Sequence, residues 1–228
     1  MIKVVLWDID GTLLNFGMSE KYAIRKCFEI FGLGECTDEM LARYAAINRT
    51  YWERLERKEL TREQVLLGRF QEFFEKEGLN ADCAAEFNAE YQVRLGDKAF
   101  FNDEGYELVK SLKGKVLQCA VTNGTKVAQD RKLRLSGLDE LLDEIFISED
   151  LGVDKPAVAF FDKVWEKIGT FEKDEVMIIG DSLTSDIQGG NNAGILCCWY
   201  NPGGKTDTTG LKIDWDIRNL QELKDIIS

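Results

Sequence analysis

The chain contains five short apolar runs that are rich in β-branched and aromatic residues and show little polar alternation. They lie at residues 2–7, 116–121, 144–147, 176–179 and 195–200. From residue 104 onward the runs are separated by segments with helical periodicity, at residues 104–112, 126–135, 158–168 and 185–192. Apolar strands separated by helices are typical of a parallel sheet that is covered on both faces. The pattern therefore predicts an α/β fold with a doubly wound parallel sheet.

One long segment breaks this alternation. From about residue 19 to residue 95 the pattern is helical only, and it predicts helices at 21–31, 38–58, 61–77 and 81–95. Thr61 stands at a plausible helix start, and a glycine follows three of the plausible helix ends. The segment directly follows the first predicted strand. We therefore expect a small all-helical domain that covers the carboxyl end of that strand.

The expected boundaries follow from these elements. Residues 1–16 and 98–228 would form the α/β catalytic core, and residues 17–97 would form an inserted helical cap. The chain crosses between the two parts near Phe16 and again between Gly96 and Phe100. Crossings of this kind serve as hinges when a cap closes over a site.

Charge and histidine content restrict the chemistry that the chain can perform. Of its 228 residues, 29 are Lys or Arg and 41 are Asp or Glu, so the net charge is -12. This balance argues against a nucleic-acid partner, which needs clustered positive charge. The chain has no histidine, which excludes histidine bases, Ser-His-Asp triads and His-ligated zinc. The negative charge of a phosphorylated substrate would have to be neutralised by local positive charge, most simply that of a divalent metal ion.

The chain shows neither a secretory signal nor an apolar stretch of the roughly 18 residues that a membrane span requires. We therefore expect a cytoplasmic protein without a membrane partner. The six cysteines lack C-x-x-C spacing, and three of them lie in apolar runs. This arrangement favours reduced core residues over disulfides or a metal cluster. The sequence shows no heptad pattern, so it predicts no particular oligomeric state.

Four stretches with chemically capable residues stand at the carboxyl ends of predicted strands. They are WDIDGT (residues 7–12), VTNGT (121–125), DKPAVAFF (154–161) and IGDSLTSD (179–186). Taken singly, each could be a turn, a helix start or a capping loop. Because parallel strands bring their carboxyl ends to one crevice, the four stretches together predict a shared site.

The four stretches, in this order, resemble the motif signature of the haloacid dehalogenase-like hydrolases, and the helical insert after the first stretch resembles that superfamily's first cap class. The resemblance implies that Asp8 is the nucleophile and forms an aspartyl-phosphate. It implies that Asp10 protonates the leaving oxygen and later takes a proton from water. Gly11 would let the backbone turn beside the phosphate.

The resemblance also implies the partners of the phosphate and of a metal. Thr122, the amides around Asn123 and Gly124, and the Lys155 ammonium would hold phosphate oxygens, and Lys155 would also restrain Asp8. Mg²⁺ is the implied cofactor. Its ligands would be Asp8, the backbone carbonyl of Asp10 and Asp181, with Asp186 orienting them from behind or through water.

Asp10 separates the chemistries known in this superfamily. Dehalogenases of the superfamily lack an acid at that position, so Asp10 favours phosphoryl transfer. A sugar-phosphate phosphatase or a phosphomutase of the same fold would share these residues, and both stay open as alternatives. A lapsed enzyme that only binds a metabolite is a further alternative, although such a protein would be expected to have lost Asp8 or Asp10.

The insert at residues 47–70, with DKPAVAFFDKV and GGNNAGILCCWYNPGG, is similar to the noncanonical pyrimidine nucleotidases, a family of 5'-nucleotidases. This resemblance implies that the partner is a small phosphorylated metabolite, specifically a pyrimidine nucleoside monophosphate. Tyr51, Trp52, Arg69 and Phe70 are then candidates for lining the nucleoside pocket, since aromatic rings stack on bases. Their alternative interpretation is packing on amphipathic cap helices, with Arg69 as a solvated charge.

Overall fold

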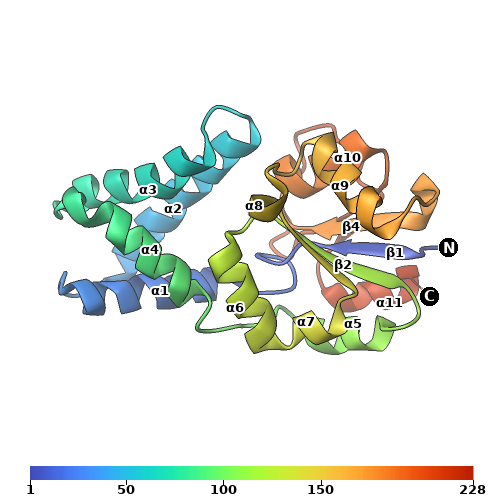
Figure 1. Ribbon diagram of the computed structural model, residues 1–228, viewed down its shortest axis with the longest axis horizontal. Helices are drawn as coiled ribbons and strands as arrows, with labels where there is room; N and C mark the ends of the chain where they lie inside the picture. Colours follow the sequence, from blue (N-terminus) through green and yellow to red (C-terminus); the bar gives the residue numbers. More distant parts are fainter. Residues whose placement is uncertain (228) are drawn as a thin grey trace.

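The computed structural model, which describes residues 1–227, contains a six-stranded sheet with helices on both faces (Figure 1). The strands are β1 (Val4–Trp7), β2 (Leu117–Thr122), β3 (Glu144–Ile147), β4 (Val176–Gly180), β5 (Leu196–Tyr200) and β6 (Trp215–Ile217). Their order is β3-β2-β1-β4-β5-β6, and every neighbouring pair is parallel. The predicted α/β fold with a doubly wound parallel sheet is confirmed.

The hydrophobic pattern does not predict β6, which pairs with β5 at the edge of the sheet. This strand has only three residues, and Asp216 interrupts its apolar character with an exposed side chain. An edge strand is paired on one side only, so its sequence is not required to be a continuous apolar run. Its position is therefore decided by pairing with Cys198 to Tyr200 of β5.

The helices of the α/β part follow the predicted positions closely, and several short helices add to them. They are α5 (Gly105–Leu112), α6 (Lys126–Ser136), α7 (Leu138–Leu141), α8 (Ser148–Leu151), α9 (Val158–Ile168), α10 (Gln188–Ala193), α11 (Leu223–Ile227), the 3₁₀ turns η2 (Lys173–Glu175) and η4 (Leu220–Glu222), and the π-helical turn η3 (Leu183–Ile187). In Figure 1, α9 and α10 lie on one side of the sheet and α5 and α11 on the other.

The central strand β1 is buried on both faces, which explains why its sequence lacks polar alternation. Val5 belongs to the apolar cluster that contains Leu108 of α5. The next residue, Leu6, belongs to the cluster on the opposite face, which contains Phe161 of α9. Successive side chains of a strand point to opposite faces, so each face requires its own apolar residues.

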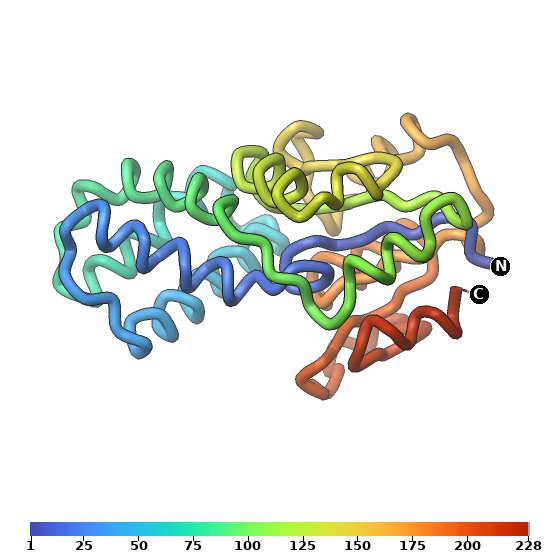
Figure 2. The backbone as a smooth tube through the Cα atoms, turned by 90° about the horizontal axis from the view of Figure 1, so that it is seen from below, coloured from blue at the N-terminus to red at the C-terminus, as the bar shows by residue number. Residues whose placement is uncertain are grey.

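The segment between β1 and α5 folds as a separate group of helices at the carboxyl ends of the strands (Figures 1 and 2). It consists of α1 (Phe16–Phe31), α2 (Asp38–Glu56), α3 (Arg62–Glu77), the 3₁₀ turn η1 (Ala81–Cys83) and α4 (Ala84–Leu95). Most of its buried apolar residues form a third cluster, to which α6 adds Ala128. Figure 2 shows the N-terminus and α11, the last helix of the described chain, at the opposite end of the molecule.

Capping residues define the helix ends in this segment. Thr61 accepts a hydrogen bond from the backbone N–H of Gln64, and the Gln64 side chain accepts one from the N–H of Thr61, which completes a capping box. Thr37 caps α2 at its first turn, one residue before the predicted start. Gly32 and Gly78 end α1 and α3 in the left-handed conformation. The separation of residues 17–97 from the core as a domain stays a prediction, which the separate apolar cluster supports.

Within residues 1–227, no helix combines the length and the apolar character needed to cross a membrane. All six cysteines are free. Cys27, Cys119, Cys197 and Cys198 are buried, and Cys36 and Cys83 are partly exposed.

Candidate active site

The end of β1 brings Asp8 to the middle of the carboxyl edge of the sheet. β1 lies between β2 and β4, and the backbone N–H of Asp8 donates to the carbonyl of Ile179 at 2.9 Å. The chain then turns sharply, with Gly11 at a φ of 101°, and the side chain of Asn102 donates to the carbonyl oxygens of Gly11 and Thr12. The nucleophile predicted from the sequence therefore rests on a rigid, hydrogen-bonded turn.

Both oxygens of the Asp8 carboxylate have a donor. The Lys155 ammonium donates to Oδ1 at 3.0 Å, and the Thr12 hydroxyl donates to Oδ2 at 3.0 Å. Asp8 is 7% exposed. Burial and then the charge of Asp186 raise the pKa of Asp8 to about 7, although Lys155 opposes this rise.

The Lys155 ammonium donates hydrogen bonds to three acceptors inside the protein. Its ammonium donates to Asp8, to the carboxylate of Asp186 at 2.6 Å and to the carbonyl of Val121 at 2.6 Å. Burial would lower the pKa of Lys155, but the charges of Asp186 and Asp8 outweigh burial and raise it. The side chain therefore stays cationic and neutralises part of the charge beside Asp8.

Asn123 holds the backbone of Lys155 rather than pointing toward Asp8. Its amide group donates to the carbonyl of Lys155 at 2.9 Å, and its carbonyl oxygen accepts from the N–H of Lys155 at 2.9 Å. The Asn123 amide also donates to the hydroxyl of Ser185 at 3.2 Å. This side chain therefore ties the ends of β2 and β4 to the segment that carries Lys155.

Three carboxylates gather at the ends of β1 and β4. Oxygen atoms of Asp8, Asp181 and Asp186 lie within 4.8 Å of one another. Burial and the charge of Asp8 raise the pKa of Asp181 well above its ordinary range. Only one buried ammonium, that of Lys155, contacts the group in residues 1–227. Hard oxygen donors with excess negative charge suit Mg²⁺, so the residues present fit the predicted metal.

The positions of Asp186 and Asp10 bear on the predicted ligand set. Asp186 accepts from Lys155 with one oxygen and from the backbone N–H of Ser182, at 3.1 Å, with the other. An aspartate held at both oxygens is suited to orient the site from behind. The Asp10 side chain turns toward α6, so any metal contact of Asp10 would use the backbone carbonyl, as expected. The ligand set stays a prediction.

Asp10 receives two short hydrogen bonds from α6. Lys132 donates from its ammonium to Oδ1 at 2.6 Å, and Gln129 donates from its side-chain amide to Oδ2 at 2.6 Å. Sequence reasoning missed both residues, because each occupies an ordinary polar position in a predicted helix. Their spacing of three residues on one helix face is the signal that could have identified them as a pair.

The predicted phosphate-binding loop follows β2 directly. The backbone N–H of Gly124 donates to the Thr122 hydroxyl at 3.0 Å, and Thr122 is 1% exposed. A Cβ at Gly124 would lie 2.1 Å from the Gln129 amide nitrogen, so a side chain at this position would displace Gln129. The loop leads into the N-terminus of α6, where the backbone N–H of Lys126 donates to the Glu149 carboxylate, in keeping with the preference of a helix N-terminus for an anion.

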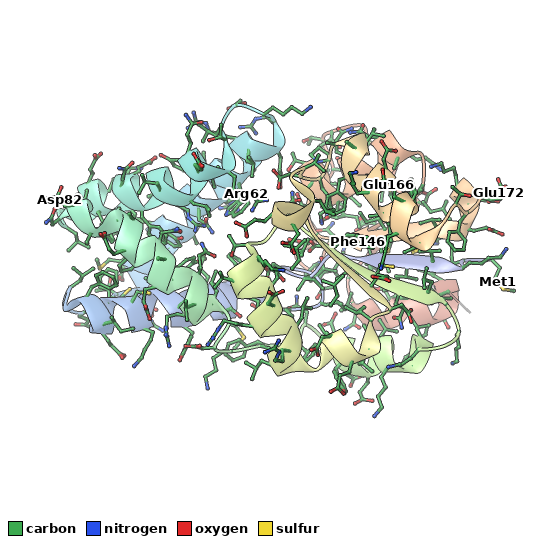
Figure 3. The ribbon with its side chains drawn as sticks, in the orientation of Figure 1. Met1, Arg62, Asp82, Phe146, Glu166 and Glu172 are labelled. Atoms are coloured by element: carbon green, nitrogen blue, oxygen red, sulfur yellow. The ribbon has the colours of Figure 1, made fainter. Side chains whose placement is uncertain are left out.

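Two side chains of the helical segment reach the core loops around this site. Arg62, at the start of α3, donates to the carbonyl of Asn123 at 3.1 Å and also to Ser148 and Asp154. Glu56, at the end of α2, accepts from the hydroxyl of Thr184. Figure 3 shows Arg62 on the side of the helical segment that faces the core. Sequence reasoning did not identify Arg62 or Glu56, since a charge at a helix end carries no sign of a distant partner.

The four candidates for the nucleoside pocket lie in different surroundings. Phe70 is fully buried and stacks on Tyr44, with 5.0 Å between ring centres. Tyr51 lies against Gly68 and lines a surface hollow with Arg54, Leu60 and Leu67.

Trp52 and Arg69 lie together. The Trp52 ring has the guanidinium groups of Arg62 and Arg69 at 5.7 and 5.9 Å from its centre. Arg69 is 1% exposed and donates to the side chains of Asn48 and Asn88, so it is not the solvated charge that the alternative interpretation describes. Through Arg62, Trp52 is the candidate with a link to the core loops.

Comparison with known proteins places the chain in a family. A sequence model of the haloacid dehalogenase-like hydrolases matches residues 2–194. The chain is 35% identical over 226 residues to the HAD-hydrolase YfnB of Bacillus subtilis, covering 99% of this chain and 95% of the relative. The crystal structure of YfnB bound to magnesium, which is described as revealing interdomain movement, superposes with a TM-score of 0.94 and covers 100% of this chain and 99% of that one.

Two further relatives have a named activity. The pyrimidine 5'-nucleotidase PynA of Streptococcus pneumoniae is 33% identical over 227 residues, covering 99% of this chain and 94% of the relative. The pyrimidine 5'-nucleotidase YjjG of Escherichia coli is 27% identical over 223 residues, covering 98% of this chain and 96% of the relative.

The central strand of the parallel sheet ends in a buried carboxylate that is paired with a lysine, and further carboxylates lie beside it. This arrangement agrees with the class of hydrolase that the four motifs predicted. The chain belongs to the haloacid dehalogenase-like hydrolase family and is a phosphatase of that family. Enzymes of this family generally use Mg²⁺. The predicted family and enzyme class are confirmed.

Proposed function

We propose that the protein is a Mg²⁺-dependent phosphomonoesterase that hydrolyses nucleoside 5'-monophosphates, with a preference for pyrimidine nucleotides. The observation that carries the proposal is the Asp8 carboxylate, which is buried at the end of the central strand and hydrogen-bonded by Lys155 and Thr12. The names of PynA and YjjG, relatives over nearly the whole chain, supply the substrate class.

Asp8 attacks the phosphorus atom with one carboxylate oxygen, and the bond between phosphorus and the ester oxygen breaks. The proton that the leaving oxygen requires comes from Asp10. A water molecule then attacks the phosphorus of the aspartyl-phosphate, and Asp10 takes a proton from that water. The products are the alcohol and inorganic phosphate, and both aspartates return to their starting states.

Lys155 and the loop after β2 supply the positive charge and the donors that phosphoryl transfer needs. Lys155 neutralises charge beside Asp8 from a buried position. In this proposal the Thr122 hydroxyl and the backbone N–H groups around Asn123 and Gly124 donate to phosphate oxygens. In this proposal Asp8, Asp181 and the Asp10 carbonyl hold Mg²⁺, with Asp186 behind them. A bound Mg²⁺ neutralises phosphate charge.

Residues 17–97 act as a cap in this proposal, and Trp52 and Arg69 contribute to the nucleoside pocket. The contacts of two side chains support the cap. Arg62 donates to groups after β2, after β3 and before α9, and Glu56 accepts from the turn after β4. These contacts support a cap that lies against the strand ends of the proposed site. The relative described as showing interdomain movement is consistent with a segment that opens and closes.

The test is phosphate release from a panel of phosphomonoesters in the presence of Mg²⁺. The panel contains UMP, dUMP, dTMP, CMP, AMP, GMP and several sugar phosphates, and Asp8→Asn is the inactive control. We expect the largest kcat/KM for a pyrimidine nucleotide and a loss of at least about 1,000-fold in the variant, since nucleophile loss removes the covalent route.

Three results would contradict parts of this proposal. Equal rates for the wild-type protein and Asp8→Asn on every substrate would exclude the phosphatase mechanism. A sugar phosphate as the best substrate would reject the nucleotidase assignment. Conversion of a sugar phosphate to an isomer without release of phosphate would identify a phosphomutase.

A further inference from the structure

Two buried polar residues of α6 have no role in the function proposed above, yet both contact Asp10. Gln129 is fully buried and Lys132 is 1% exposed. They lie three residues apart, one turn along the helix, and their side chains point to the same carboxylate. Lys132 bonds Oδ1 and Gln129 bonds Oδ2, each at 2.6 Å. Asp10 is thus held at both oxygens by one rigid helix.

The burial of Lys132 indicates that this contact is built for Asp10. A buried ammonium without a partner is costly, and lysine is almost never fully buried unless it is paired. Asp10 is the carboxylate that Lys132 pairs with in the described chain. The ammonium also lies 5.1 Å from the centre of the Phe16 ring, at the predicted hinge. The side chain is therefore fixed between the hinge and Asp10.

Gln129 adds a second feature that a purely structural contact would not require. While its Nε2 donates to Asp10, its Oε1 is buried and accepts no hydrogen bond from any group in residues 1–227. Buried polar atoms are nearly always paired. Gln129 also lies directly against Gly124 of the predicted phosphate loop. The Gln129 side chain, which carries the free acceptor, is therefore beside the place where a phosphate ester, or the attacking water, would lie.

We propose that Gln129 and Lys132 are positioning residues, which hold the Asp10 carboxyl group in the orientation that delivers a proton to the leaving oxygen. The proposal rests on the function proposed above, in which Asp10 performs that transfer. A carboxylate has about four lone-pair sites, so each oxygen keeps a site for the transferred proton after bonding to α6. Fixing the donor within a fraction of an ångström is what efficient proton transfer requires.

The step has a defined balance. Asp10 enters the first half-reaction as the carboxylic acid, carrying the proton that it took from the attacking water in the preceding turnover. That proton moves to the ester oxygen while the Asp8 oxygen forms a bond to phosphorus and the ester bond breaks. Gln129 and Lys132 neither gain nor lose a proton. Their effect is limited to substrates whose leaving group must be protonated, such as a nucleoside 5'-alkoxide. A nitrophenolate leaves as the anion and does not require the transfer.

The experiment compares kcat/KM for UMP, a nucleotide, with kcat/KM for 4-nitrophenyl phosphate, in the presence of Mg²⁺. This constant reports the steps up to departure of the leaving group, so it isolates the first half-reaction. The ratio of the two constants, nitrophenyl over nucleotide, is independent of how much of a variant is folded. It therefore stays informative if a variant is less stable.

We expect Lys132→Met and Gln129→Leu each to raise the ratio by about 100-fold, in line with the contribution of general acid catalysis. Asp10→Asn should raise it at least as much. Lys132→Arg, which keeps a cationic donor, should restore part of the effect. The matched control is Gln92→Leu, which removes a buried side chain that bonds the Thr125 hydroxyl at 2.7 Å beside the same helix. Its ratio should equal that of the wild-type protein.

Each failure has its own signature. If Asp10→Asn raises the ratio and neither α6 variant does, the positioning proposal is overturned while the proposed function stands. A rise in the Gln92→Leu control as large as in the α6 variants would show that the effect is structural, and it would also overturn the proposal. If Asp10→Asn leaves the ratio unchanged, the role of Asp10 in the proposed function fails, and the positioning proposal fails with it.

Discussion

Gly11 offers a sharp test of how the turn after β1 supports the site. Its φ is 101°, and a Cβ at this position would lie 2.6 to 2.7 Å from three atoms of the Asp181 carboxyl group. Gly11→Ala therefore introduces two separate costs. One is backbone strain in a region that L-residues rarely adopt. The other is a steric clash with a carboxylate that the proposed function places on Mg²⁺.

The two costs can be given magnitudes. An unfavourable positive φ costs about 1–3 kcal/mol for a residue with a side chain. Relief of the clash requires a shift of about 1 Å, because carbon atoms in ordinary contact lie about 3.5 Å or more apart. A displacement of that size in a catalytic group costs about 100-fold in rate. We expect Gly11→Ala to be less stable by about 1–3 kcal/mol and about 100-fold less active.

Gly34→Ala is the matched control, because Gly34 also has a positive φ, 86°, but a Cβ there would meet no atom within 4 Å. The control therefore carries the backbone strain without the clash. The assays are urea unfolding, for the free energy of unfolding, and phosphate release at saturating Mg²⁺. Both variants should lose stability, and only Gly11→Ala should lose activity. Equal activities of the two variants would refute the reasoning from the Asp181 contact.

Three further predictions concern the helical segment and the metal. Phe70→Ala should lower the free energy of unfolding by about 3–5 kcal/mol in urea, because Phe70 is fully buried in an aromatic cluster; a loss below about 1 kcal/mol would contradict that packing role. Burial raises the pKa of Glu20 from 4.5 to about 7, so the folded state holds the proton more tightly and stability falls as the pH rises from about 4.5 to 7. Urea unfolding across this range should show the wild-type protein losing about 3 kcal/mol more than Glu20→Gln, and parallel curves would reject the assignment. Chelation with EDTA should reduce phosphate release by about 100-fold or more, with recovery on adding excess Mg²⁺; a rate unaffected by EDTA would argue against a metal at the carboxylate group.

The strands and the helical segment could be predicted because burial of a strand or of a helix face imposes a characteristic spacing of apolar residues along the chain. Residues 4–7 are apolar at successive positions because β1 is covered on both faces, and the same holds for Val176–Gly180 of β4. The three-residue edge strand β6 shows no such spacing. Asp8, Thr122, Lys155 and Asp181 could be singled out since they follow predicted strands, whose carboxyl ends meet at one edge.

The helical segment shows where a local sequence pattern stops being informative. Trp52, Arg69 and Phe70 lie on amphipathic helices, and periodicity shows that such helices bury a face. It does not show what that face packs against. Phe70 packs inside the helical segment, whereas Trp52 lies next to Arg62, which bonds the core loops. That choice depends on how four helices pack together, which is a property of the whole segment.

The α/β class, the helical insert and the acids at the strand ends can be read from the sequence, because each depends on a periodicity or a motif within a few adjacent residues. The partners of those acids follow only from the packing of the folded chain. Lys132 lies 122 residues from Asp10, and Arg62 lies 92 residues from Asp154. Contacts at such separations are set by the packing of α6 and α3 against the sheet edge. No local pattern records them, because hydrogen bonds and charges act through space and not along the chain.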